Sequence, residues 1–203
     1  MNILHIDSCA LGDHSVSRQL TANAAAALAE IDHTARVIYR DLAAAPLSHV
    51  SGPLMQAMLG QWDKNIPMSA ELRAEVLQSE SLLQEFLDAD VLVLGAPLCN
   101  FSIPSTLKVW LDRLLLGCAP VASNARLPFE LVRDKRVLLV SAPSHDVGEH
   151  PGTMQTLENN LNMVFKHIGI SVVETFHSEQ SLPAQLNALL AQEPAKDDTR
   201  RAA

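Results

Sequence analysis

The sequence predicts one α/β domain, residues 1–192, built on an open parallel sheet with helices on both faces. Short apolar runs alternate with helical patterns along the chain, which is the pattern of parallel strands joined by crossover helices. The central run Val91-Leu92-Val93-Leu94 is apolar at every position, as expected of a strand buried on both faces. With 203 residues and 48% hydrophobic composition, the chain is long enough for a single large core.

Apolar periodicity places each element of this sheet. Strands are expected at 2–6, 34–39, 91–95, 136–141 and 171–176. Helices are expected at 15–31, 54–61, 69–87, 105–116, 154–168 and 182–192. The polar segment 193–203 is expected to be a disordered tail. The connection 43–67, which carries three prolines, is long enough to form a lid over the site. An ordinary surface loop is an equally good interpretation.

The first strand ends in a polar loop, and Ser15-Val16-Ser17 then opens an Ala-rich helix. The first N–H groups of a helix have no intrahelical partner and carry the positive end of its dipole, so this is a place to hold a phosphate. Ser15 and Ser17 would add two hydroxyl donors. The alternative, at about equal weight, is that Ser15 only caps the helix.

The third strand repeats this plan. It is followed by the loop Ala96–Pro104 and by a helix that begins at Ser105. Loops of an open parallel sheet emerge together at the carboxyl ends of the strands, where ligands bind at the reversal of strand order. We therefore expect Ser15, Ser17, Asn100 and Phe101 to converge on one crevice.

Charge and composition exclude several classes of partner. The net charge of -8, with only 15 Lys plus Arg, argues against binding to a nucleic-acid backbone. No apolar run is long enough to cross a bilayer, and no signal peptide precedes the first strand. An odd number of cysteines, three, fits a reducing compartment. We expect a cytoplasmic protein without a nucleic-acid or membrane partner.

Several side chains of the sequence could be reactive, and each also has a simpler role. Cys9 and Cys99 follow neighbouring strands, so a redox pair is conceivable, but a buried thiol is more often a small apolar residue; Cys118 is assigned to packing. The cluster 145–150 fits no zinc template, so no metal is expected. A serine-hydrolase interpretation using Ser8 or Ser141 with His145 is set aside, because no Gly-x-Ser-x-Gly or orienting acid is present.

A family resemblance rests on two segments. They are Asp7-Ser8 with Ser15-Val16-Ser17 and Leu20, and the run from Ala96 to Pro104 with Leu107-Lys108 and Asp112. Together they resemble the FMN-dependent NADH azoreductases, also described as NAD(P)H:quinone oxidoreductases. The similarity extends from the first strand to about His177, and the run Pro-x-x-Asn-Phe-x-Ile-Pro followed by Leu-Lys is its most specific part.

The resemblance implies a flavodoxin-like sheet of order 2-1-3-4-5 and a homodimer whose second subunit completes the cavity. It implies FMN as cofactor, NADH or NADPH as electron donor, and two-electron, ping-pong reduction of a quinone or azo compound. The cofactor-binding residues that it implies are Cys9, Ser15, Val16, Ser17, Pro97, Leu98, Cys99, Asn100, Phe101, Ser141 and Ser144. His145 is the catalytic candidate near the flavin, and a solvated loop is its alternative role.

The chain departs from this pattern in two loops. Ser141-Ala142-Pro143-Ser144 stands where the family has a glycine pair, and Leu98-Cys99 replaces Met-Tyr. These changes leave two alternatives open: a flavin-free binding or regulatory module, and a flavoenzyme specialised for one intermediate. Phe101 is either a ring-contacting residue or a core plug, and Asp112 with Arg113 is either a dimer contact or a surface pair.

Overall fold

The five strands that the structure describes form one parallel sheet. The structure is a computed structural model that describes residues 1–118, 134–142 and 152–192. The strand order is β2-β1-β3-β4-β5, which confirms the expected topology. The strands are β1 (Asn2–Asp7), β2 (Arg36–Asp41), β3 (Val91–Gly95), β4 (Arg136–Val140) and β5 (Val172–Phe176). The order reverses between β1 and β3, so the ends of these two strands flank the expected crevice.

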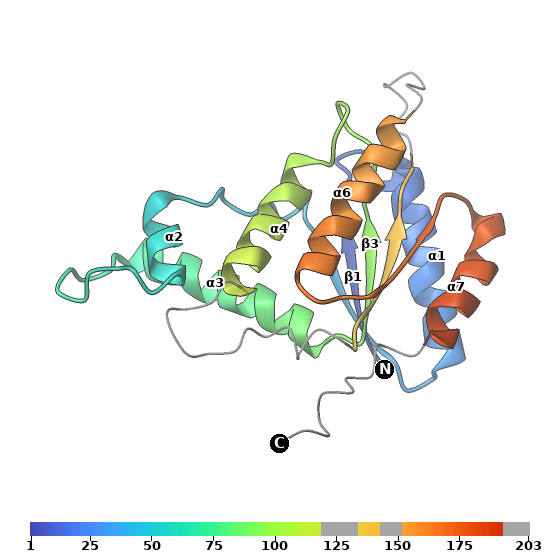
Figure 1. Cartoon of the computed structure of the whole chain (residues 1–203), viewed down its shortest axis with the longest axis horizontal. Coiled ribbons are helices and arrows are strands. Elements are labelled where there is room, and N and C mark those ends of the chain that lie inside the picture. Colours follow the sequence, from blue (N-terminus) through green and yellow to red (C-terminus); the bar gives the residue numbers. More distant parts are fainter. Residues whose placement is uncertain (119–133, 143–151, 193–203) are drawn as a thin grey trace, which may run out of the picture.

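Helices cover both faces of the sheet (Figure 1). On one face lie α1 (Val16–Ile31) and α7 (Leu182–Ala191). On the other lie α3 (Ala70–Asp88), α4 (Ser105–Cys118) and α6 (Thr153–His167). The short α2 (Gly52–Met58) packs beyond the sheet against α3 and α4. Within the described part of the chain, no helix is both long enough and apolar enough to cross a membrane.

Strand β3 divides the core into two apolar layers. Every residue of β3 is buried. Leu92 and Leu94 face the layer under α3, α4 and α6, whereas Val91 and Val93 face the layer under α1 and α7, because successive side chains of a strand point to opposite faces. The uninterrupted apolar run that predicted this strand is therefore explained by helices on both sides.

Most element boundaries differ from those expected by one to three residues, and two of these shifts have a clear local cause. Strand β2 begins at Arg36 rather than at residue 34, because the Asp32 carboxylate accepts the Thr34 N–H (2.9 Å) and holds a turn there. Helix α2 begins at Gly52 rather than 54, since the Ser51 hydroxyl accepts the Leu54 N–H (3.2 Å) and Pro53 fits the first turn.

Arg113 is fully buried on α4, so neither role suggested for it from the sequence is right. Its guanidinium donates to the Ser48 carbonyl (2.8 Å) and to the Ser79 hydroxyl on α3 (2.8 Å), and it lies 3.6 Å from the Glu75 carboxylate. Burial lowers the pKa of Arg113, against the attraction of Glu75. The arginine thus ties the connection after β2 to α3 and α4.

Candidate functional site

The loop after β1 forms a pair of buried hydroxyls at the start of α1. Ser15 Oγ accepts the Arg18 N–H (3.3 Å), which makes Ser15 the N-cap, and it lies 2.9 Å from Ser17 Oγ. Both serines are 2% exposed, whereas Val16 between them is half-exposed. Cys9 is buried in the preceding loop. The site therefore combines a capping serine, a second hydroxyl and a helix N-terminus, the features of an anion site.

A network of polar side chains fixes this loop from behind. Buried Asp7 accepts hydrogen bonds from Thr21 Oγ1 (2.7 Å) and Tyr39 Oη (3.0 Å). Arg18 donates to Tyr39 Oη (2.9 Å) and to Asp41 (2.6 Å). Partial burial, with the charge of Asp7, raises the pKa of Tyr39 to about 12. The network joins the first turns of α1 to β1 and β2.

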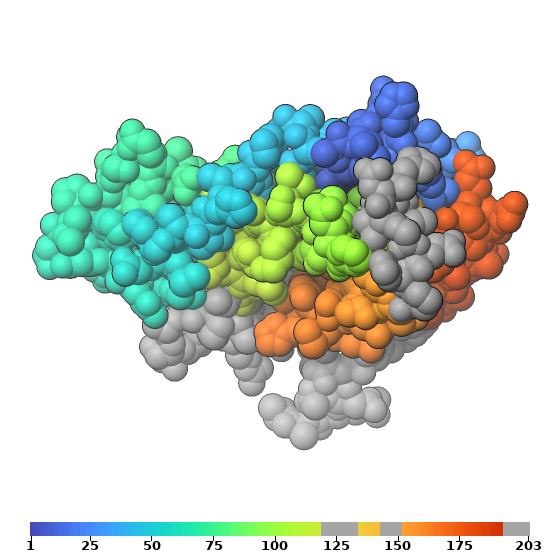
Figure 2. Space-filling model, turned by 90° about the horizontal axis from the view of Figure 1, so that it is seen from above, coloured from blue at the N-terminus to red at the C-terminus, as the bar shows by residue number. Residues whose placement is uncertain are grey.

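The loops after β1 and β3 are in direct contact. Ser8 Oγ donates to the Gly95 carbonyl (2.7 Å), and Thr106 Oγ1 on α4 donates to the Ser8 carbonyl (3.2 Å). A Cβ on Gly95 would lie 3.0 Å from the Asp7 carboxylate, so a larger residue would have to push Asp7 back by a few tenths of an ångström. Figure 2 looks onto this edge of the molecule and shows the two loops side by side. The two loops are therefore in contact through Ser8, Gly95 and Thr106, and the convergence of Ser15, Ser17, Asn100 and Phe101 on one crevice stays a prediction.

The loop after β3 contains a tight, strained turn. The backbone N–H and C=O groups of Cys99 and Ser102 bond to each other (2.8 and 2.9 Å) around Asn100 and Phe101, whose φ angles are +47° and +66°. This left-handed backbone suits Asn but is uncommon for Phe. Phe101 is 61% exposed, so its interpretation as a core plug is wrong. Pro97 and Leu98, which precede the turn, are buried.

The end of β4 brings together three polar residues that the sequence did not connect. Ser141 is fully buried, and its hydroxyl donates to Glu158 Oε1 on α6 (2.6 Å). His177 Nδ1 lies 2.9 Å from the Ser141 carbonyl oxygen. His177 Nδ1 also lies 3.5 Å from Ser141 Oγ. In a hydrolase triad the serine O–H would donate to the histidine and the histidine to the acid, whereas here the hydroxyl donates to Glu158 and Nδ1 bonds to the Ser141 carbonyl, so these residues do not form one. The signal in the sequence was a carboxylate in the apolar stripe of α6.

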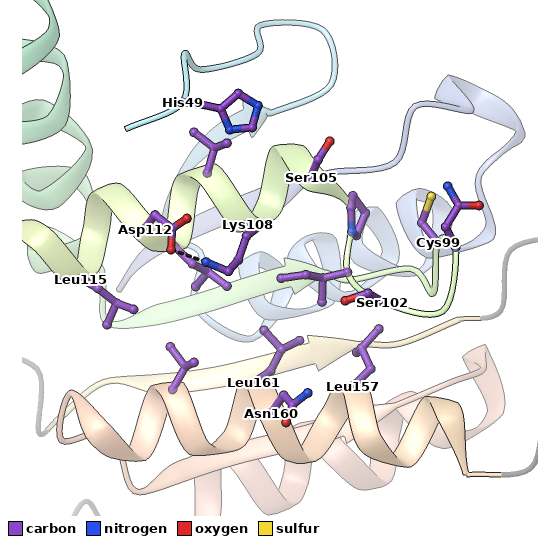
Figure 3. A pocket seen from close by; sticks show the side chains of 16 residues that line it. His49, Cys99, Ser102, Ser105, Lys108, Asp112, Leu115, Leu157, Asn160 and Leu161 are labelled. Atoms are coloured by element: carbon purple, nitrogen blue, oxygen red, sulfur yellow. Dashed lines mark hydrogen bonds and ion pairs between the residues drawn. The ribbon is translucent and has the colours of Figure 1, made fainter. Parts of the chain in front are cut away.

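A cavity of about 600 Å³ lies between α4 and α6 and reaches the loop after β3 (Figure 3). Its floor is apolar, and the ion-paired Lys108 and Asp112 lie at its rim. Cys99 and Asn100 line it, but Cys9 is not among its lining residues. The two thiols therefore do not share this cavity. The remaining lining residues are His49, Ser102, Ile103, Pro104, Ser105, Val109, Leu111, Leu115, Leu157, Asn160, Leu161 and Val164.

Two residues of the expected site, Ser144 and His145, lie outside the described residues, as do the cluster 145–150 and the tail 193–203. Within residues 1–118, 134–142 and 152–192, no group of three or more His, Cys, Asp or Glu side chains is arranged to hold a metal ion.

Cys118 is buried, which raises the pKa of its thiol to about 11 and fits its assignment to packing.

Comparison with known proteins agrees with the fold and extends it. A family model described as flavodoxin-like fold matches residues 1–197. FMN-dependent NADH:quinone oxidoreductase 2 of Bradyrhizobium diazoefficiens is 38% identical over 200 residues, covering 93% of this chain and 96% of that protein. FMN-dependent NADH:quinone oxidoreductase 1 of Pseudomonas syringae pv. tomato is 42% identical over 176 residues, covering 84% and 83%.

Solved structures show the same fold at lower identity. An FMN-dependent NADH-azoreductase from Bacillus anthracis in complex with FMN superposes with a TM-score of 0.72 at 16% identity, covering 94% of this chain and 97% of that one. The chain is thus a flavodoxin-like protein with its candidate site at the carboxyl edge of the sheet. Within that class, it belongs to the family of the FMN-dependent NADH:quinone oxidoreductases.

Proposed function

We propose that this chain binds FMN at the carboxyl edge of its sheet and uses NADH or NADPH to reduce quinones or azo compounds. The observation that carries the proposal is the contact between two loops of complementary character. One holds the paired hydroxyls of Ser15 and Ser17 at a helix N-terminus, and the other holds the strained, exposed turn at Asn100 and Phe101. The family of the chain supports the same conclusion.

The residues present fit the two chemically different ends of FMN. A phosphate needs several hydrogen-bond donors and positive potential, which the start of the 16-residue α1 and two hydroxyls supply without a buried cation. Arg18 next to them is engaged by Tyr39 and Asp41. A flat ring needs apolar contact and backbone polar groups at its rim, and the turn at Asn100 offers both.

The role of the protein is to bind and orient, since FMN when bound would supply the hydride-accepting ring. Ser15, Val16 and Ser17 hold the phosphate, and Cys9 belongs to the loop that leads to them. Pro97, Leu98 and Cys99 fix the loop that carries Asn100 and Phe101 to the ring. We also assign Ser144 and His145 to the flavin, whereas Ser141, which is fully buried with its hydroxyl bonded to Glu158, supports the site from inside the protein. The proposed reduction requires no side-chain nucleophile from this chain.

We further propose that the active form is a cytoplasmic homodimer. The apolar cavity between α4 and α6 runs up to Cys99 and Asn100, so a second copy seated there would border the cofactor loop. Met163, next in sequence to the cavity-lining Val164 on α6, is 64% exposed, and exposed apolar surface is typical of interfaces. All three cysteines are free thiols, in keeping with a reducing compartment.

The first test is to incubate the purified protein with excess FMN, desalt it and record its visible spectrum before and after anaerobic NADH. We expect a retained flavin band that bleaches with NADH and recovers with a quinone. A protein that neither retains FMN nor quenches flavin fluorescence in a titration would contradict the proposal and favour a flavin-free module. Turnover with a quinone, an azo dye and a nitroaromatic then distinguishes broad from narrow acceptor use.

A further inference from the structure

Every polar group of Ser141 is engaged within the protein. Its N–H donates to the Phe176 carbonyl (3.2 Å) at the end of β5. Its hydroxyl donates to Glu158 Oε1 (2.6 Å), with the weaker acceptor Met154 Sδ at 2.8 Å and His177 Nδ1 at 3.5 Å. Its carbonyl accepts a hydrogen bond from His177 Nδ1 (2.9 Å). With its one hydroxyl proton used inside a fully buried site, Ser141 is a fixed point of the loop after β4.

The two side chains that hold Ser141 come from different elements and face each other. Glu158 lies on α6, and His177 directly follows β5. Because a carbonyl oxygen only accepts, His177 Nδ1 carries the hydrogen and its Nε2 is directed to Glu158 Oε1, 3.6 Å away. The carboxylate is buried, whereas the imidazole is half-exposed. A carboxylate and an imidazole thus grip the hydroxyl and the carbonyl of one residue.

The two neighbours of Ser141 in sequence are hydrogen-bonded to the loop after β3. The next residue, Ala142, accepts the Leu98 N–H at 3.0 Å, and Val140 before it accepts the Ala96 N–H at 2.8 Å. Leu98 is followed by the strained turn at Asn100. Fixing Ser141 therefore fixes the start of the turn, although the two loops are more than 40 residues apart in sequence.

We propose that Glu158 and His177 are positioning residues for the flavin loops: they clamp Ser141 and so hold the Leu98–Phe101 turn ready for its ligand. The ligand part of this inference rests on the proposed function, whereas the clamp itself does not. A turn with two left-handed residues costs conformational energy, and hydrogen bonding to Ala142, beside the clamped Ser141, keeps the turn in one conformation before binding.

The first test measures amide hydrogen exchange of the flavin-free protein. Glu158→Ala and His177→Phe should speed exchange of the Leu98 amide about tenfold, because the acceptor Ala142 is no longer held. His177→Asn, whose amide N–H can still donate to the Ser141 carbonyl, should restore slow exchange. Glu158→Gln should stay close to the unaltered protein, since its amide oxygen still accepts the Ser141 hydroxyl.

The second test measures FMN affinity by fluorescence quenching. Glu158→Ala should raise the FMN dissociation constant about tenfold, and Glu158→Gln less than about threefold. Glu174→Ala is the matched control: it removes another Glu with a side-chain hydrogen bond, to Gln192 (2.6 Å), from the neighbouring strand β5. It should alter neither measurement.

Two results would overturn the clamp. One is Leu98 exchange within about twofold of the unaltered protein in both Glu158→Ala and His177→Phe; the other is faster exchange spread evenly over the sheet, which indicates a general loss of stability. Because His177 is half-exposed, its variants test the clamp even where Glu158→Ala does not fold. An unaltered protein that binds no FMN would refute the proposed function, and the exchange data would still decide the clamp.

Discussion

The loops after β1 and β3 meet at one edge of the sheet but are built in opposite ways. The β1 loop is held by hydrogen bonds between neighbours in sequence: Ser15 caps the helix that follows it and lies within hydrogen-bond distance of Ser17. The β3 loop is held at long range, by Ala142 beyond β4 and by Ser8 beyond β1, and it carries left-handed backbone at Phe101. Local hydrogen bonds fix the proposed anion site together with its helix, whereas a strained turn needs its surroundings to persist.

This difference predicts that the β1 loop contributes mainly to cofactor affinity and the β3 loop mainly to cofactor orientation. An anion held by hydroxyls and helix N–H groups gains binding energy with little dependence on distant parts of the fold. A turn that wraps a ring depends on α4, to which it leads, and on the strand ends around it. We therefore expect changes at the first loop to reduce cofactor retention, and changes that loosen α4 to disturb the second loop and general stability.

Loss of Arg113 is expected to have the largest effect. Arg113→Met removes the hydrogen bonds to Ser48 and Ser79 and leaves buried acceptors unpaired, which should lower the free energy of unfolding by about 3 kcal/mol. Urea unfolding of the flavin-free protein measures it. Arg73→Met, which removes an exposed guanidinium from α3, should change it by less than about 0.5 kcal/mol. Equal effects of the two substitutions would contradict the role of Arg113.

Removal of the paired hydroxyls comes next. The double substitution Ser15→Ala and Ser17→Ala should weaken FMN binding about a hundredfold, because two hydrogen bonds to a charged group are lost. Ser69→Ala is the matched control, since Ser69 caps α3 in the same manner (3.1 Å to the Leu72 N–H) away from the edge. It should lower stability by about 1 kcal/mol and leave the FMN dissociation constant unchanged. Unaltered FMN affinity in the double variant would refute the phosphate assignment.

A smaller effect is expected at the strained turn, with opposite signs for stability and function. Phe101→Asn places a residue that tolerates φ of +66° and should maintain or raise the midpoint of thermal unfolding. It should also lower kcat/KM for quinone reduction about tenfold, by loss of the exposed ring. Phe101→Tyr keeps the ring and should retain activity. A stability loss in Phe101→Asn would show that the turn is not strained.

The smallest effect concerns the network behind the first loop. The chain has one tyrosine, so phenolate absorbance reports Tyr39 alone, with a midpoint at about 12 in the folded protein and about 10 in denaturant. Because the folded pKa is raised, the stability from Tyr39 is present below pH of about 10 and is lost as pH rises to about 12. Asp7→Asn should move the folded midpoint toward 10, and a midpoint unchanged by this substitution would show that Asp7 is not its neighbour.

Patterns local in the chain were sufficient to predict the architecture and the cap at the start of α1. The all-apolar β3 and the alternation of strands with helices were sufficient for the sheet, because burial on two faces and crossover connections leave a direct trace in residue order. The capping serine at the start of α1 was predicted in the same way, since a cap involves neighbours in sequence, and the phosphate role of Ser15 and Ser17 stays a prediction. The assignment of Ser144 and His145 to the site remains a prediction.

Tertiary structure alone decided which distant polar residues hold these loops. Nothing in the sequence around Arg113 distinguished a buried anchor from a surface cation, and its partners lie 34 to 65 residues away. Glu158 and His177 meet Ser141 only because α6 and β5 pack beside β4. Hydrogen bonds depend on distances of about 3 Å between atoms, and such distances arise from packing, whereas hydrophobic periodicity is already present in the order of the residues.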